Sequence, residues 1–383
     1  MMSSRYGLRS GLLQLRRCQS TKANGIWTDF SQRAASLKIN NDSIKDTLFG
    51  QVNPEKGPAS MNNKEESLSY HSPLAIDETF QMAYKILENE ADSKYKIVNR
   101  LKKSLENATS EKNVVAIKEQ IDKYLIEAEA QNPEVLYNAE FFEPEQLDKT
   151  QPIYRHLLKQ KWENYDLLVT MQRLEQLHVI PDTLPTLVPK ADVKVKFTHN
   201  TDDQFSKWVT PGELLPAFAV SEPPTIHIQE FDRVEGNNNL YTILLVNPDT
   251  PNLETNSFTT TMHYGLKNVP LNNADNVIDV SKLMEVGPRI TFQEYVPLTP
   301  EKNAPAQRAC LWVFRQSESL GDISDTSENF DIREFVAKHG LTPIGAHVWR
   351  QKFDRSVPEI RQLYGLGEGR VYEKFRSMDP INL

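Results

Sequence analysis

The chain is poor in cysteine and has no long apolar run. Its 383 residues include two cysteines, Cys18 and Cys310. Cys18 lies in a segment that we interpret below as a cleaved leader, which would leave Cys310 alone and exclude an intrachain disulfide or a thiolate metal cluster. Cys310 stands inside an apolar run, so we predict a small buried residue of a strand. No uninterrupted apolar run approaches the roughly 20 residues that cross a bilayer, and we expect no membrane span.

The sequence also lacks the signatures of common enzymes. It contains no Gly-rich phosphate loop ending in Lys-Ser/Thr, no Gly-x-Ser-x-Gly elbow and no His-Glu-x-x-His helix. The eight histidines are dispersed and do not follow the spacing of metal ligands. We therefore expect no enzyme, no catalytic residue, no cofactor and no metal site.

Negative charge is absent from the first 23 residues. This stretch carries Arg5, Arg9, Arg16, Arg17 and Lys22, with leucines and serines between them. A basic, acid-free, Ser-containing and amphipathic N-terminus is typical of a mitochondrial presequence. We predict a presequence at residues 1–20, processed near Arg16–Ser20; the alternative is a disordered basic tail.

The chain as a whole is acidic, with a net charge of −8. Loss of residues 1–20 lowers Lys+Arg from 44 to 40 against 52 Asp+Glu, so the processed chain carries about −12. Such a chain is not a general nucleic-acid binder, and any RNA contact must come from local basic patches. We predict two patches, whose alternative in each case is a solvated surface: Lys94, Arg100 and Lys103 in a helix, and Arg350, Lys352, Arg355 and Arg361 near the C-terminus.

Residues 21–71 are polar and interrupted by Asn53-Pro54 and Gly57-Pro58. This composition predicts an extended arm that becomes ordered on a partner. We interpret its spaced apolar residues as docking anchors: Trp27, Phe30, Leu37, Leu48 and Phe49.

Residues 72–180 have the character of a helical extension. Ser72 is a suitable N-cap and Pro73 suits a first helical position. Phe80, Tyr84 and Leu87 then follow at helical spacing. We expect further helices over 93–107 and 111–130. Another is predicted from Pro152, capped by Thr150, to the prolines at 181 and 185.

Strand patterns follow over residues 181–355. Apolar and polar residues alternate over 192–197 and 225–231, whereas 241–246 is continuously apolar, as in a strand buried on both faces. We expect further strands at 260–267, 277–280, 289–295, 308–314 and 343–353, and a helix at 331–339 closed by Gly340. Ser356 and Glu359 form a capping-box pattern that opens a helix of the C-terminal extension, 356–383.

This β region resembles the phosphatidylethanolamine-binding-protein (PEBP) family. The motif Asn247-Pro248-Asp249-Thr250-Pro251 is similar to the family's Asp-Pro-Asp-x-Pro loop after a buried strand. His263 matches a pocket histidine, and Arg308 lies in the second signature. The resemblance implies an α+β fold: a PEBP-like, mainly antiparallel β-sheet domain with peripheral helices. Here it is preceded by an all-α N-terminal extension and followed by a C-terminal helical tail.

The family pocket binds an anionic head group, and the sequence departs from it at three places. Asn247 replaces the first aspartate, Asn303-Ala304-Pro305 replaces a Gly-x-Gly loop, and Gln307 replaces the signature histidine. Proline has no N–H to donate, and glutamine cannot carry a positive charge. We therefore predict a degenerate anion pocket, with weakened or lost binding, formed by Asn247, Asp249, His263, Gln307 and Arg308.

A second resemblance covers most of the chain. A PEBP-like domain with a mitochondrial leader and extensions at both ends is similar to a family of mitochondrial large-subunit ribosomal proteins. Residues 341–345 and 371–375 have counterparts in that family. The resemblance implies a structural component of the large ribosomal subunit in the mitochondrial matrix, at the central protuberance. Its partners would be large-subunit rRNA and neighbouring mitochondrial ribosomal proteins, with no small-molecule substrate.

The alternative is a soluble mitochondrial PEBP-like protein that binds an anionic lipid head group or a nucleotide, or that regulates an enzyme. Such a binding module has no need of a long arm and two extensions, and its pocket loop is expected to be intact. The altered loop from Asn303 to Gln307 favours the ribosomal interpretation.

Overall fold

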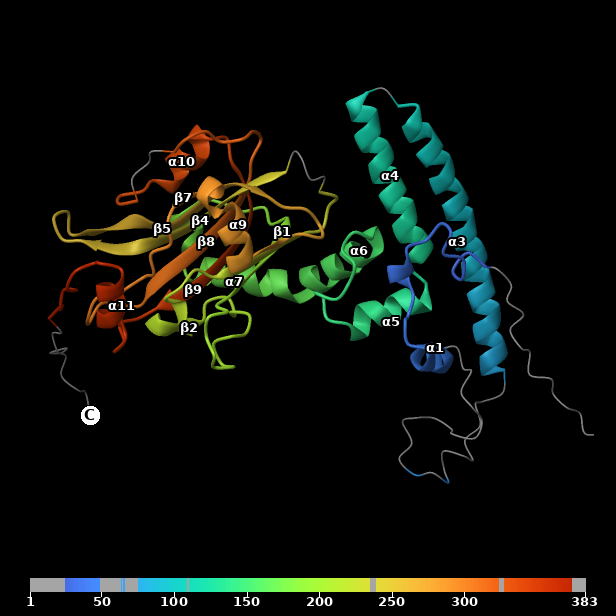
Figure 1. Cartoon of the computed structure of the whole chain (residues 1–383), viewed down its shortest axis with the longest axis horizontal. Helices are drawn as coiled ribbons and strands as arrows, with labels where there is room; N and C mark the ends of the chain where they lie inside the picture. The colour runs from blue at the N-terminus through green and yellow to red at the C-terminus, as the bar shows by residue number, and fades with distance from the viewer. Residues whose placement is uncertain are drawn as a thin grey trace, which may run out of the picture. The chain divides into compact units, whose positions relative to one another are not determined.

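The computed structural model describes residues 25–48, 63, 65, 75–108, 110–234, 239–323 and 327–373. The predicted presequence and the predicted helix start at Ser72 and Pro73 lie outside these residues, as does Phe49. The chain divides into two compact units, Met1–Phe141 and Phe142–Leu383, each of which is described by itself (Figure 1). None of the described helices is long and apolar enough to cross a membrane.

The first unit is helical. Its elements are the 3-10 turn η1 (Ala35–Leu37) and the helices α1 (Asp42–Leu48), α3 (Ile76–Glu106), α4 (Glu111–Glu129) and α5 (Pro133–Phe141). The sequence predicted a break between two helices near residue 90, and this was wrong. Neither glycine nor proline occurs between Leu87 and Tyr95, and Ala91, Tyr95 and Val98 continue one buried face. The helix therefore runs uninterrupted for 31 residues.

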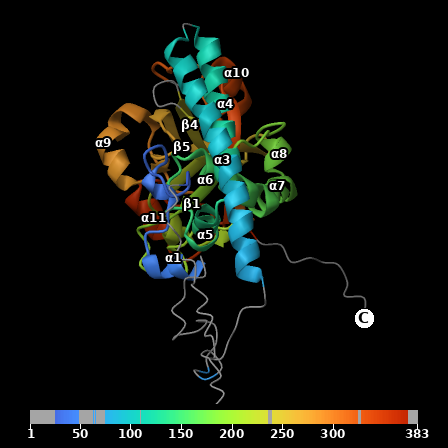
Figure 2. The same ribbon diagram turned by 90° about the vertical axis from the view of Figure 1, so that its right-hand side faces the viewer.

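Helices α3 and α4 form an antiparallel hairpin, seen side by side in Figures 1 and 2. Its base holds a small core in which Trp27 packs against Ala91, Tyr95 and Ala128. The Trp27 indole donates to the carbonyl of Ala128 at 3.2 Å and meets the Tyr84 ring edge-on at 5.2 Å. Residues from both helices and from the preceding segment thus share one apolar cluster.

A buried ion pair lies beside this cluster. The Arg33 guanidinium contacts Glu129 at 2.6 Å (Nε to Oε1) and 3.0 Å (Nη2 to Oε2), with both side chains almost fully buried. Arg33 also donates to the carbonyl of Trp27, and Glu129 accepts from the Tyr95 hydroxyl at 2.6 Å and from Asn132 at 2.7 Å. Every oxygen of the carboxylate is thereby satisfied, as a buried charge requires.

Over residues 25–48 the structure differs from the predicted extended arm. Trp27 and Leu37 are buried within the first unit, and α1 forms where no helix was expected. The Ile39 N–H donates to the Glu134 carboxylate at 2.8 Å, and Asn138 donates to the carbonyl of Lys38 at 3.2 Å. The expected anchors Trp27 and Leu37 therefore dock on the chain's own helices.

The second unit begins with helices. They are α6 (Pro152–Lys161), the π-turn η2 (Trp162–Asp166), α7 (Leu167–Gln176) and α8 (Val179–Asp182). The predicted cap at Thr150 is not formed: its hydroxyl donates to Asp148 at 2.5 Å, and Gln151 occupies the cap position. Leu174 of α7 is fully buried in the same apolar cluster as Leu244 and Trp312, so this helix packs on the β domain.

Two sheets form the β domain. The larger has the strand order β2-β9-β8-β4-β5-β7 and the smaller the order β1-β3-β6. The strands are β1 (Ala191–Lys196), β2 (Leu214–Leu215), β3 (Thr225–Glu230), β4 (Leu240–Asn252), β5 (Ser257–Pro270), β6 (Val277–Ile278), β7 (Thr291–Gln293), β8 (Gln307–Arg315) and β9 (Thr342–Gln351). Apart from the parallel β2–β9 pair, all strand pairs are antiparallel. The predicted α+β class is confirmed.

The larger sheet is buried on both faces. Ile243 and Leu245 of β4 face a core shared with Val193 and Ile226 of the smaller sheet. Leu244 and Val246 face a second core with helices α7 and α10 (Ile332–Lys338). This explains the continuous apolar run of β4. Cys310 of β8 is buried, as predicted, in the second core.

Three local predictions differ from the structure. Helix α9 (Val280–Ile290), with Pro288 in its last turn, occupies the first two residues of the strand expected at 289–295, and β7 is confined to Thr291–Gln293. β3 is buried along its whole length, because its second face is covered by polar neighbours such as Lys149 and Asn276. Ser356 does not form a capping box before α11 (Val357–Leu363), since its hydroxyl donates to Asp354 at 2.5 Å. Between β2 and β3 lies one further 3-10 turn, η3 (Ala217–Val220).

We expect Arg33→Met to loosen the helical unit by about 3 kcal/mol, because removal of one partner leaves the Glu129 charge buried and unpaired. Hydrogen exchange of the backbone amides of α3 and α4 in the full chain measures this, and protection should fall roughly 100-fold. Arg100→Met makes the same change at an exposed position of α3 and should shift stability by less than about 0.5 kcal/mol. Equal protection in the two variants would contradict a structural role for the Arg33–Glu129 pair.

Candidate functional site

Four residues of the predicted degenerate pocket lie on β4 and β8, which pair antiparallel with Val246 opposite Cys310, and the fifth, His263, lies on β5. This register brings Asn247 and Gln307 together, and the Asn247 amide nitrogen donates to the Gln307 amide oxygen at 3.1 Å. Both side chains are buried. The Asn247 oxygen accepts from the N–H of Asp249 at 3.0 Å. The two substituted positions thus satisfy each other and the backbone of β4 where its register with β5 shifts, between Asn247 and Thr250.

Arg308 binds the neighbouring carboxylate by several contacts. Its Nε lies 2.8 Å from Oδ2 of Asp249 and its Nη2 2.5 Å from Oδ1, while its backbone N–H donates to Oδ2 at 2.8 Å. Nη1 donates to the carbonyl of Leu177 at 2.7 Å and to the Asp182 carboxylate at 2.8 Å. Burial by itself lowers the pKa of Arg308, but the hydrogen bonds that Arg308 donates to Asp249 and Asp182 outweigh it and raise the pKa above its ordinary value.

This arrangement changes the chemistry available at the site. A guanidinium binds carboxylate and phosphate through the same paired donors. Here those donors already face two carboxylates and a helix-terminal carbonyl of the same chain. An entering anion would have to displace Asp249. The cluster is therefore a structural clamp that joins β8 to the second half of β4 and to the end of α7.

His263 of β5 is held in a neutral state. Its Nδ1 lies 2.8 Å from the carbonyl oxygen of Val296, which makes Nδ1 the donor. Its Nε2 is buried and has no partner among the described residues. Burial lowers the pKa of His263 to about 4, and the hydrogen bond to Val296 opposes this only in part. A neutral imidazole gives an anion no charge to bind.

The chain's own C-terminal extension is hydrogen-bonded to the loop that replaces the Gly-x-Gly segment. Asn303, with a φ of 68°, donates from its side chain to the carbonyl of Tyr372 at 2.7 Å, and the Tyr372 N–H donates to the carbonyl of Lys302 at 3.1 Å. Arg361 of α11 donates to the Thr299 hydroxyl at 3.1 Å. Contacts between residues more than 60 positions apart left no local signal in the sequence, and they were not predicted.

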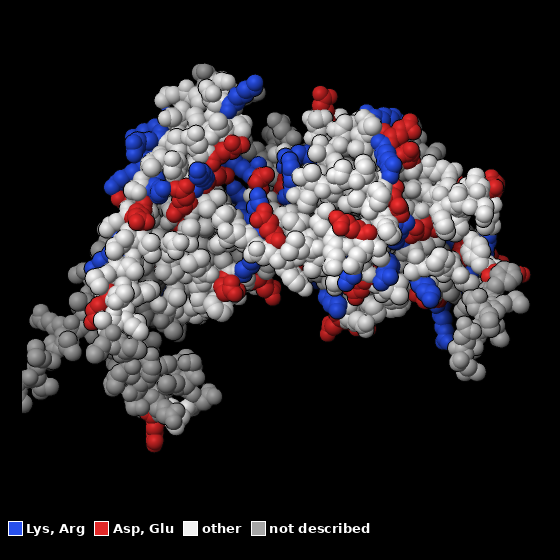
Figure 3. Space-filling model, turned by 180° about the vertical axis from the view of Figure 1, so that it is seen from behind, with Lys and Arg blue, Asp and Glu red and all other residues white. Residues whose placement is uncertain are grey.

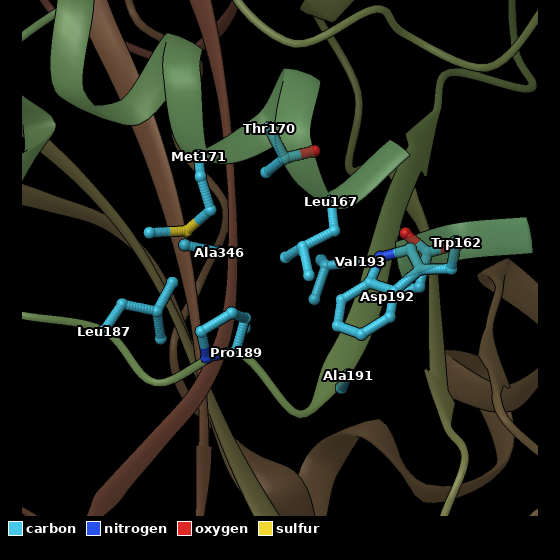
Figure 4. Close-up of a pocket in the computed structure, with 11 residues that line it drawn as sticks. Trp162, Leu167, Thr170, Met171, Leu187, Pro189, Ala191, Asp192, Val193 and Ala346 are labelled. Carbon is cyan, nitrogen blue, oxygen red and sulfur yellow. The ribbon is translucent and has the colours of Figure 1, made fainter. Parts of the chain in front are cut away.

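A small cavity lies elsewhere in this unit, between the segment η2–α7 and strands β1 and β9 (Figure 4). Trp162, Leu167, Met171 and Leu187 point into it. Its volume of about 10 Å³ holds at most one water molecule. Among the described residues, no three His, Cys, Asp or Glu side chains are grouped to hold a metal ion.

The residues predicted to contact RNA are divided between the two units. Some are exposed, and others are bound to groups of their own chain. Lys94 is paired with Glu127 at 2.5 Å and lies over the Tyr124 ring, whereas Arg100 and Lys103 are exposed. In the β domain, Arg350 donates to the carbonyl of Gly212 at 3.0 Å. Arg361 donates to the Thr299 hydroxyl and to the carbonyls of Leu366 and Gly367. Arg350 and Arg361 thus both hold backbone segments of their own chain. Lys352 and Arg355 are exposed.

Comparison with known proteins gives the following similarities. Residues 205–349 match the family described as phosphatidylethanolamine-binding protein. Over 218 residues the chain is 33% identical to large ribosomal subunit protein mL38 of Schizosaccharomyces pombe, an alignment that covers 56% of the chain and 66% of that relative. Among solved structures, it is similar to a phosphatidylethanolamine-binding protein from Plasmodium vivax, with 15% identity and a TM-score of 0.36, covering 48% of the chain and 98% of that structure. It is also similar to a carboxypeptidase Y inhibitor solved with its cognate proteinase, with 12% identity and a TM-score of 0.38, covering 48% and 95%.

We expect Arg308→Met to destabilise the β domain by about 3 kcal/mol, because Asp249 loses its partner in a half-buried position. Urea unfolding of the full chain measures the change in stability. Hydrogen exchange of the backbone amides near Asp249 and Leu177 measures the effect on these two regions. The matched control is Arg173→Met, an exposed arginine of α7, with an expected change below about 0.5 kcal/mol. If Arg308→Met leaves both regions as stable as the control does, the clamp does not hold them.

The state of His263 predicts a pH dependence. Its pKa of about 4 in the folded chain lies below the ordinary 6.5, so between these values the unfolded chain binds a proton that the folded chain does not. Stability is therefore lost as the pH falls from about 6.5 to about 4, by up to about 3 kcal/mol for one such group. His263→Asn keeps a donor for Val296 and should flatten this loss in unfolding measurements at several pH values. An unchanged profile in the His263→Asn variant would contradict this assignment.

Proposed function

Residues 205–349 belong to the phosphatidylethanolamine-binding-protein family, and from this premise we propose that the chain is a structural component of the large subunit of the mitochondrial ribosome. The observation that carries the proposal is the 33% identity over 218 residues to the curated large-subunit protein mL38. The matched region covers 66% of that relative, so the role of the whole protein is part of the proposal.

The geometry of the site supports a structural use of the PEBP-like domain. Arg308 is bound by Asp249 and Asp182, His263 is neutral, and Asn247 is paired with Gln307. Each of these groups serves the fold of its own chain. The domain thus acts as a rigid body, and no enzymatic activity is proposed for it.

The finer parts of the proposal concern place and partners. We infer a position at the central protuberance, in the mitochondrial matrix, from the resemblance of the sequence to the mitochondrial ribosomal family. The partners would be large-subunit rRNA and neighbouring ribosomal proteins. The acidic net charge of −8 favours a peripheral component held largely by other proteins, with RNA reached through local basic surfaces.

Sedimentation tests this function directly. A detergent lysate of purified mitochondria is separated on sucrose gradients at low and at high salt, and each fraction is probed for this chain. We expect migration with the large subunit at both salt concentrations, because extensive contacts do not depend on screened surface charge alone. Recovery of the chain only at the top of both gradients would contradict the proposal and favour a free PEBP-like binding protein. A known soluble matrix protein, probed in the same fractions, controls for trapping.

A further inference from the structure

The end of the α3–α4 hairpin remote from the Trp27 cluster has a character of its own. We define the hairpin tip as residues 93–118, which include the turn between the two helices (Figures 1 and 2). Val98 and Ile121 are the last well-buried residues along the seam. Beyond them, Leu101, Leu105, Val114 and Ile117 are only half-buried. The tip is therefore a projecting pair of helices that buries little apolar surface between its two helices.

Positive charge is concentrated in this projection. The tip contains seven Lys or Arg and two Glu, a net charge of +5, in a chain of net −8: Lys94, Lys96, Arg100, Lys102, Lys103, Lys112 and Lys118 against Glu106 and Glu111. The preceding part of α3, residues 76–92, has one lysine and five acidic residues, a net charge of −4. The helix is thus polarised along its length. Figure 3 shows the Lys and Arg side chains gathered on the upper part of the hairpin.

Most of these cations are not committed to the fold. Lys94 is paired with Glu127, and Lys96 with Asp92 at 2.6 Å in an exposed pair. Arg100, Lys102, Lys103 and Lys112 are exposed and form no ion pair with a described residue. Lys96, Arg100 and Lys103 recur at i, i+4 and i+7, so they share one face of the helix over about 10 Å.

The composition of the tip distinguishes between classes of partner. Protein interfaces are built on aromatic or apolar anchors, but Val115 is the single large apolar side chain that is exposed within the described part of the tip. Such anchors stand instead on the acidic part of α3, where Ile76, Phe80, Met82 and Ile86 are exposed. Single-stranded RNA is bound by stacking on exposed aromatics. The one aromatic residue of the tip, Tyr95, is buried.

We propose that the hairpin tip is an RNA-binding arm that contacts the phosphate backbone of double-stranded RNA through Arg100 and Lys103, assisted by Lys96, Lys102 and Lys112. Duplex RNA is recognised mainly by its shape and its phosphates, which requires clustered cations and no base-stacking platform. This inference rests on the proposed function, because it names rRNA duplex as the partner of one surface of the chain.

The test compares two variants of the full chain that have the same net charge. The tip variant carries Arg100→Glu and Lys103→Glu. The control carries Lys85→Glu, on the acidic part of α3, and Lys207→Glu, an exposed lysine of the β domain. Binding to a labelled 20-base-pair RNA duplex, and to a single strand of equal length, is followed by fluorescence anisotropy from low to high salt. Circular dichroism and thermal melting verify that each variant is folded.

We expect the wild-type chain to prefer the duplex and the tip variant to bind it at least tenfold more weakly. Each lost phosphate contact lowers the slope of log K against log salt by about 0.9, so the tip variant should lose about 2 from the slope. The control should change affinity less than about threefold, because its lysines lie outside the tip. Absence of duplex binding by the wild-type chain, or an equal loss in both variants, would overturn the inference. A preference for the single strand would also overturn it.

Sedimentation of the same variants separates this inference from the proposed function. If the wild-type chain migrates with the large subunit while the tip variant binds duplex RNA as tightly as wild type, the inference fails alone. If purified chain binds duplex through the tip but never migrates with the large subunit, the proposed function fails and the RNA-binding arm stands. A tip variant that leaves the large subunit but keeps its RNA affinity would indicate a protein neighbour and contradict the inference.

Discussion

The β domain depends on one arginine. Arg308 is the second residue of β8, and its guanidinium holds the second half of β4 through Asp249, the end of α7 through the carbonyl of Leu177, and α8 through Asp182. A planar guanidinium has five donors, so it holds the Asp249 carboxylate by two nitrogens while the third binds two further partners, whereas a lysine ammonium has three donors and lacks this fork geometry. The same commitment removes the cation that an anion pocket would use. One interaction therefore both fixes the strands and helices around Arg308 and occupies the donors of its guanidinium.

The helical unit follows a comparable principle. Arg33 and Glu129, 96 residues apart, form a buried pair whose remaining hydrogen-bonding positions are filled by Trp27, Tyr95 and Asn132. A buried charge is tolerated only when its partners are complete. The segment that contains Trp27 and Arg33 is thus fixed to the base of the hairpin. The tip has no such support, and its seam is only half-buried.

The distribution of charge relates these features to function. An acidic chain has no general affinity for RNA. In α3, however, an acidic part with exposed apolar side chains is followed by the basic tip. In a ribosomal component this arrangement would allow one helix to face a protein neighbour with one part and an RNA duplex with the other. The PEBP-like domain, with its pocket groups bound internally, then contributes shape and rigidity.

Local patterns in the sequence determined much of the β domain. Period-two alternation predicted β1, a continuous apolar run predicted β4, and the position of Cys310 predicted its burial, because each depends on neighbours within a few residues. The motifs also predicted which residues meet near Asn247 and Arg308. Tertiary structure decided the rest: the partners of Arg308 at Leu177 and Asp182, the docking of Trp27 on Ala128, and the hydrogen bond from Asn303 to Tyr372. These contacts join residues 69 to 131 positions apart, and no local spacing specifies a partner at such a distance, since only the packing of complete elements brings the two side chains together.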